Sequence, residues 1–182
     1  MKPVERQEIV DYATYEDERS EFRARVIEAK TPRRVHIGEY ITLLFENHMT
    51  VRYQIQEMIR AERMVRESDI RHELNTYNEL LGGVGELGCT LLIEIEEPAV
   101  RDRKLVEWWS LPEKIYLLQE NGTRVRATFD ERQRGEGRLS SVQYLKFNTL
   151  GNVPVAAGVD MTGFQVETPL TREQQEALRA DL

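Results

Sequence analysis

The 182-residue sequence contains a single cysteine, Cys89. One thiol excludes an internal disulfide, a four-cysteine iron–sulfur cluster and a cysteine-built structural zinc site. Basic charge is also scarce, because 25 Lys and Arg residues stand against 32 Asp and Glu residues, which gives a formal net charge of −7. Nucleic-acid-binding domains are normally basic, so we expect no nucleic acid among the partners of this protein.

The sequence also lacks an apolar run of about 18 residues, the length that a membrane-spanning helix requires. Its opening residues, Met1–Glu5, are not typical of a secretory signal peptide. We therefore expect a cytoplasmic protein without a membrane partner. Neither an internal repeat nor a low-complexity tract interrupts the sequence, and its length is close to that of one domain. The sequence thus predicts a single domain spanning residues 1–182.

Helical and strand patterns occupy different halves of the sequence. Residues 1–85 are helix-rich, residues 86–170 are strand-rich, and a short C-terminal helix is expected over 171–180, capped by Thr171. The expected helices are 14–30, 51–66, 70–81 and 99–110, and the expected strands are 34–37, 40–46, 87–96, 114–119, 123–130, 140–148 and 153–161. Because helices and hairpins are segregated, we predict an α+β fold with the N-terminal helices packed on a largely antiparallel sheet.

Turn and cap residues mark the ends of these elements. Gly38-Glu39 suits a two-residue hairpin and Asn121-Gly122 is a strong hairpin signal. Thr50 is expected to cap helix 51–66. Gly82-Gly83 are expected to end helix 70–81 because glycine accepts positive φ.

Two of the expected helices carry polar residues on their apolar faces. At about 100° per residue, Gln54 and Glu62 fall within the apolar stripe of helix 51–66. Glu73 projects onto the edge of the apolar face of helix 70–81, which includes Tyr77. Helices joined by a short link usually pack together, so Glu62 and Glu73 are expected to lie close. The stripe itself comprises Val51, Ile55, Met58, Ile59 and Val65.

These polar residues allow two interpretations. The first is a polar pocket formed by Gln54, Glu62, Glu73 and Tyr77, which could hold a metal ion with the help of a histidine. The second, which we favour, is a structural network in which buried carboxylates pair with Arg19 or Arg25, since buried ion pairs also occur without catalysis. In either case we expect Glu62 to be largely buried and directly paired, because an unpaired buried carboxylate is costly.

The other chemically versatile residues have ordinary structural interpretations. None of the three histidines, His36, His48 and His72, forms a local two-ligand spacing. Cys89 lies in an apolar strand without a neighbouring histidine, so we expect a buried thiol rather than a nucleophile.

Gly82-Gly83-Val84-Gly85 follows a helix and precedes a strand, whereas phosphate loops lie between a strand and a helix N-terminus.

Trp108 and Trp109 point about 100° apart, so one is expected in the core and the other near the surface. An aromatic side chain near the surface often anchors an interface, and we therefore predict a homodimer.

One long motif string resembles a known family. The string comprises Phe45-Glu46, TVRYQIQEM at 50–58, Arg60-Ala61-Glu62, IRHEL at 70–74, Tyr77-Asn78 and TLLIE at 90–94. The sequence thereby resembles the uncharacterised bacterial family catalogued as domain of unknown function 3501, over nearly the whole chain from Tyr15-Glu16 to Gly158-Val159-Asp160.

The resemblance implies a setting rather than a mechanism. Genes of this family are often found beside those of rubrerythrin and of an iron–sulfur oxidoreductase, which implies a role near redox or peroxide metabolism. Neither a cofactor nor catalytic residues follow from it. Many relatives carry histidines where Gln143 and Met161 stand here, so a cofactor ligated by those histidines would find no equivalent ligands in this chain.

Two functions remain open from the sequence. The first is an uncharacterised accessory or binding protein with a redox-protein partner. The second is a metal-binding protein or enzyme that uses a buried carboxylate pocket around Glu62 and Glu73.

Overall fold

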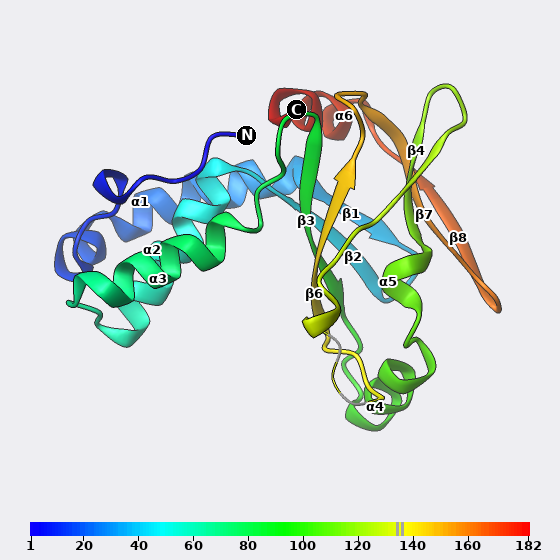
Figure 1. Cartoon of the computed structure of the whole chain (residues 1–182), viewed down its shortest axis with the longest axis horizontal. Coiled ribbons are helices and arrows are strands. Elements are labelled where there is room, and N and C mark those ends of the chain that lie inside the picture. Colours follow the sequence, from blue (N-terminus) through cyan, green and yellow to red (C-terminus); the bar gives the residue numbers. More distant parts are fainter. Residues whose placement is uncertain (134, 136) are drawn as a thin grey trace.

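The computed structural model describes residues 1–133, 135 and 137–182. Within these residues, two four-stranded antiparallel sheets are formed, with strand orders β1-β2-β3-β6 (sheet A) and β5-β4-β7-β8 (sheet B) (Figure 1). The strands are β1 Arg34–Ile37, β2 Ile41–Glu46, β3 Glu86–Ile93, β4 Ile115–Gln119, β5 Arg124–Arg126, β6 Val142–Asn148, β7 Pro154–Met161 and β8 Phe164–Pro169. The helices are α1 Tyr12–Lys30, α2 His48–Glu62, α3 Glu67–Asn78, α4 Pro98–Glu107, α5 Leu111–Lys114 and α6 Arg172–Asp181. The protein is therefore α+β, as the segregated patterns predicted.

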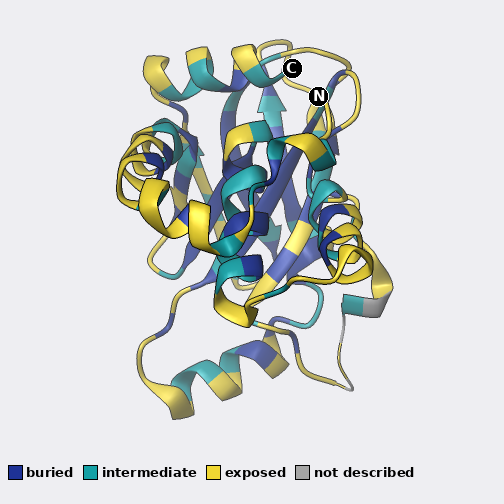
Figure 2. Ribbon diagram, turned by 90° about the vertical axis from the view of Figure 1, so that its left-hand side faces the viewer, coloured by how far each residue is buried: buried dark blue, intermediate teal, exposed yellow. Residues whose placement is uncertain are grey.

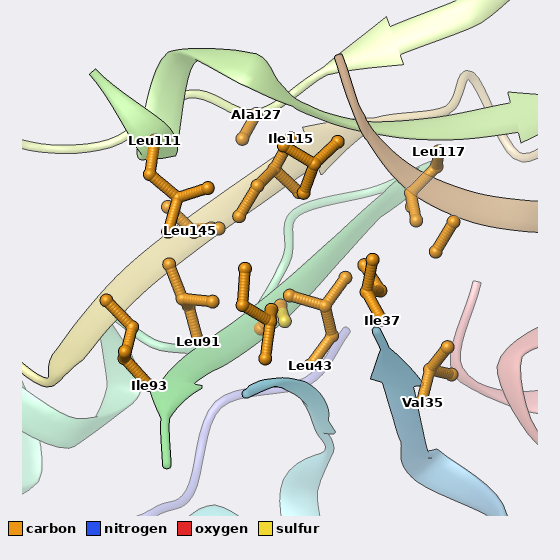
Figure 3. Packing of buried hydrophobic residues seen from close by; sticks show 14 of the residues in the cluster. Val35, Ile37, Leu43, Leu91, Ile93, Leu111, Ile115, Leu117, Ala127 and Leu145 are labelled. Carbon is orange, nitrogen blue, oxygen red and sulfur yellow. The ribbon is translucent and has the colours of Figure 1, made fainter. Parts of the chain in front are cut away.

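The main apolar core lies between the two sheets. Leu43, Leu91 and Leu145 of sheet A face Ile115 and Leu117 of sheet B, and all five side chains are buried (Figure 3). Successive side chains of a strand point to opposite faces of its sheet, and these residues all point to the face that packs against the other sheet, as expected for packed antiparallel sheets. Figure 2 shows buried residues gathered at the sheets and exposed residues on the outward faces of the helices.

The helices α1, α2 and α3 project from one side of sheet A and carry apolar clusters of their own (Figure 1). Ile55 and Ile59 of α2 pack with Ile70 and Leu74 of α3, which is the stripe-to-stripe contact that the helical periodicity predicted. Tyr15, Phe22 and Val26 of α1 form a second cluster, which is packed against Tyr53 of α2.

A buried carboxylate joins this helical group to sheet A. Glu46, the last residue of β2, accepts hydrogen bonds from the hydroxyls of Thr50 (2.5 Å) and Thr90 (2.7 Å). The prediction that Thr50 caps the helix is wrong: Asn47 is the N-cap residue, and Thr50 completes a capping box three residues later. α2 therefore starts earlier than expected, with its first turn tied to both β2 and β3.

Close backbone packing, rather than positive φ, explains the glycines Gly82 and Gly88 after α3. Neither Gly82 nor Gly83 has positive φ, so that prediction is wrong, and Gly85 (φ 73°) takes that conformation instead. A Cβ placed on Gly88 of β3 would lie 1.8 Å from the carbonyl oxygen of Leu80. The chain leaving α3 thus crosses directly over β3, which fixes α3 beside sheet A.

Strand boundaries differ from prediction mainly in sheet B. The strand expected over 123–130 ends at Arg126, after which Thr128 forms an isolated bridge with Lys146 of β6. The strand β8 was not predicted, and its side chains are alternately half-buried and exposed. The hairpin between β1 and β2 has a three-residue loop, 38–40, rather than the two-residue loop expected.

Candidate functional site

A cavity of about 550 Å³ lies between α3 and the outer face of β6. One wall comes from the C-terminal part of α3 and the residues after it, the opposite wall comes from β6, and the floor comes from the segment that follows β5. The lining residues are Thr76, Tyr77, Glu79, Leu80, Thr128, Phe129, Asp130, Gln133, Tyr144, Leu145 and Lys146. Because both walls are regular elements, the shape of this cavity is set by the fold.

The floor of the cavity is fixed to the edge of β6 by hydrogen bonds. The backbone N–H and C=O of Thr128 pair with those of Lys146, each at 2.8 Å. The side-chain amide of Gln133 then accepts from the Tyr144 N–H (2.6 Å) and donates to the Tyr144 carbonyl (3.2 Å). These contacts satisfy backbone groups that an edge strand would otherwise leave open.

Tyr77 is the predicted site residue that faces this cavity. Partial burial raises the pKa of its hydroxyl, a hydrogen bond from Gln54 lowers that pKa, and the nearby Glu73 raises it further. Tyr144 on the opposite wall and Glu62 add smaller upward effects on the same pKa. The structure therefore brings Gln54 and Tyr77 together, with Glu73 and Glu62 close enough to affect the pKa of Tyr77.

Glu62 and Glu73 lie close together, but they line a separate surface hollow of about 410 Å³. The prediction that Glu62 is buried and paired is wrong, since its side chain is exposed. The reason is the length of α2: the helix ends at Glu62 and the chain turns at Arg63 in the left-handed conformation (φ 49°), so the expected last turn does not exist. Val65, which was expected in the apolar stripe, is exposed for the same reason.

The arginine predicted to pair with Glu62 pairs with Glu57 instead. Arg19 donates two hydrogen bonds to Glu57 (2.7 and 2.9 Å), and the Tyr15 hydroxyl donates a third (2.8 Å). The bonds from Arg19 hold the pKa of Glu57 below its ordinary value, against the opposing effect of partial burial. Arg25, the other predicted partner, lies over the ring of Phe22 at 5.7 Å. Arg19 therefore forms an ion pair between α1 and α2, but with a partly buried carboxylate that is neither Glu62 nor Glu73.

This network predicts an acid-dependent loss of stability. Because the pKa of Glu57 is lower in the folded state than its ordinary value of 4.5, the pair stabilises the fold above that pH and loses its effect as the pH falls further. We expect Glu57→Gln to lower the free energy of unfolding by about 1–2 kcal/mol at neutral pH. Urea titrations from about pH 7 to about pH 3 should show this difference shrinking in acid. The exposed Glu18→Gln on α1 is the control, and a Glu57→Gln deficit that stays constant with pH would contradict the assignment.

Metal-type ligands are not clustered in the described residues: no three His, Cys, Asp or Glu side chains lie together in a way that could hold a metal ion. The Nδ1 atom of His36 lies 2.8 Å from the Thr42 hydroxyl, which also donates to Glu94. His48 contacts Glu8 at 3.2 Å, and His72 lines the hollow beside Glu62.

Cys89 is a buried thiol, as expected. Burial raises its pKa well above the ordinary value, and the nearby Glu46 adds to that effect. A thiol with a raised pKa is mostly protonated at neutral pH and is a poor nucleophile.

Gln143 and Met161, the positions at which the family resemblance implied histidines in relatives, are both internal here. Gln143 is fully buried, and its Nε2 atom donates to the Ser140 carbonyl, while its Oε1 atom has no hydrogen-bond partner in the described part of the chain. Met161 is buried in the main core, where its sulfur atom accepts from Ser110.

Trp108 and Trp109 divide as predicted. Trp108 is buried and stacks on Phe164 with ring centroids 5.1 Å apart, and Trp109 is half-buried at the edge of the main core. The homodimer inferred from this pair stays a prediction.

Two packed antiparallel sheets with a helical extension define an α+β protein with a cavity between α3 and β6. The chain belongs to the family described as protein of unknown function DUF3501, whose model matches residues 3–182. No curated protein matches it. It is similar over its full length to a crystal structure described as a novel protein of unknown function from Burkholderia pseudomallei K96243, with 27% identity, a TM-score of 0.91 and full coverage of both chains.

Proposed function

We propose that this protein is a cytoplasmic, non-enzymatic binding protein that serves as an accessory to a redox system. The observation that supports a binding role is the cavity between α3 and β6, which combines aromatic walls with a few polar groups. No helix among the described residues is long and apolar enough to cross a membrane.

The redox setting rests on the gene neighbourhood implied by the family resemblance. Electrons would have to be carried by a partner, because one buried cysteine cannot hold an iron–sulfur cluster. We therefore propose a redox protein as the partner and assign no electron-transfer step to this chain.

Partner capture from native cells tests this function. Bait protein would be crosslinked in lysate at low salt and compared with two variants of α3. Thr76→Trp places a large ring in the cavity, and Asn75→Trp adds the same ring to an exposed position outside the cavity lining. We expect a redox protein to be captured by the wild type and by Asn75→Trp, and capture to fall with Thr76→Trp. Capture of no redox protein by the wild type would count against the proposal.

The alternative function, a metal-binding protein or enzyme that uses Glu62 and Glu73, has less geometric support. Both side chains line one hollow with Asp69 and His72, but Glu62 is exposed rather than buried. Elemental analysis of protein purified without a chelating tag separates the two functions. A metal bound at one equivalent per chain and lost in Glu73→Gln would favour the alternative.

A further inference from the structure

The cavity between α3 and β6 has aromatic rings on three sides. Tyr77 belongs to α3, Tyr144 to β6, and Phe129 to the segment between them. Rings in such positions favour a flat ligand, because offset and edge-on packing of aromatic systems is stabilising. The volume of about 550 Å³ falls in the range of roughly 300–1,000 Å³ that small organic ligands occupy.

A single cation lines the described part of this cavity. Lys146 lies two residues from Tyr144 on the outer face of β6, and no carboxylate in the described residues forms an ion pair with it. Of the two acidic residues in the lining, Glu79 is exposed to solvent, and Asp130 is already engaged in an interaction of its own. A ligand with one acidic group would therefore supply a counter-charge for Lys146, which has none among the described residues.

The cavity also opens onto apolar surface. Tyr144 is 41% exposed and Val142, the next outward residue of β6, is 39% exposed. A ligand larger than the enclosed volume could extend along these side chains. The hydroxyls of Thr76, Tyr77 and Thr128 supply neutral hydrogen-bonding groups around the aromatic walls.

We propose that this cavity binds a small aromatic monoanion, with its rings packed between Tyr77, Phe129 and Tyr144 and its acidic group at Lys146. This assignment deepens the proposed binding function, on which it rests, by naming the chemical class of the ligand. It requires no covalent or redox step by the protein itself.

Two matched fluorescent dyes test the assignment directly. The probe 1-anilinonaphthalene-8-sulfonate is an aromatic monoanion, and N-phenyl-1-naphthylamine has the same ring system without the sulfonate. We expect the anionic dye to bind the wild-type protein with one dye per chain. Replacing the cation with Lys146→Gln should weaken the anionic dye roughly tenfold and leave the neutral dye unchanged, since only the sulfonate can form an ion pair with the ammonium group.

The α3 variants locate the binding. Thr76→Trp should remove the binding of both dyes, and Asn75→Trp should leave both affinities unchanged. Thermal melts of each variant would establish that the fold is retained. Three results would each overturn the assignment. The first is that Thr76→Trp leaves the affinity for the dyes unchanged, and the second is that the wild type does not bind one dye per chain. The third is that Lys146→Gln changes the affinity for both dyes equally. The dye experiment does not depend on partner capture. Dye binding without capture of a redox protein would support the ligand site alone, and capture without dye binding would support the redox partner alone.

Discussion

Asp181→Ala is expected to lower the free energy of unfolding by about 3–5 kcal/mol, because it leaves a buried arginine without its counter-charge. Asp181 accepts two hydrogen bonds from Arg33, at 2.6 and 2.9 Å, and the exposed fractions of the two side chains are 7% and 11%. Arg33 also donates to the carbonyls of Ala29 and Ala177. The pair therefore joins α6 to the end of α1, two elements at opposite ends of the sequence.

The position of Asp181 supports this expectation. It is the last residue of α6, where the helix dipole disfavours an acidic side chain. Its stabilising effect must therefore come from Arg33 and not from the helix. Urea unfolding monitored by circular dichroism would measure the loss.

A second ion pair on the same helix provides the control. Arg172 and Glu176 are 93% and 55% exposed, and they form an ion pair with a nitrogen–oxygen distance of 2.9 Å. Exposed pairs of this kind contribute about 0–1 kcal/mol, so Glu176→Ala should change stability by less than about 1 kcal/mol. Equal effects of Asp181→Ala and Glu176→Ala would show that burial of the Arg33 pair does not decide its contribution.

Local patterns in the sequence were sufficient to predict most elements. The 3.6-residue periodicity located α1, Asn121-Gly122 located the β4–β5 hairpin, and Thr171 is the N-cap residue of α6. The strand β8 was missed although Phe164 and Val166 alternate with Gln165 and Glu167, because the alternating stretch is short and is followed by Pro169. The early end of α2 was missed because Arg63 adopts a left-handed conformation that its residue type does not favour.

Only some residues of the candidate site could be predicted from the sequence. Gln54 was predicted because it interrupts the apolar stripe of helix 51–66, and Tyr77 because it belongs to the apolar face of helix 70–81. Phe129, Tyr144 and Lys146 were missed because they come to the same cavity as Tyr77 only in the folded chain, from positions 52 to 69 residues later in the sequence. Tyr144 and Lys146 also occupy the outward positions of β6, where sequence alternation predicts solvent.

The close approach of the chain after α3 to β3 leads to the second large expected effect, that of Gly88→Ala. A Cβ on Gly88 would lie 1.8 Å from the Leu80 carbonyl oxygen and 3.0 Å from the Gly82 backbone nitrogen. Both are backbone atoms, so relief requires the chain after α3 to move away from β3. We expect a loss of about 3 kcal/mol or more, at the upper end of the effects of overpacking.

The same displacement should reach the cavity, because Leu80 contributes both the obstructed carbonyl and part of the lining. Gly88→Ala should therefore weaken the anionic dye even under conditions in which the variant remains folded. Gly83→Ala is the matched control: its Cβ would approach the flexible carboxylate of Glu86 at 3.0 Å and no backbone atom within 4 Å. Its φ is not positive, so we expect a change within about 1 kcal/mol and unaltered dye affinity. If Gly88→Ala were as stable as Gly83→Ala, the crossing of the chain over β3 would not be what holds α3 in place.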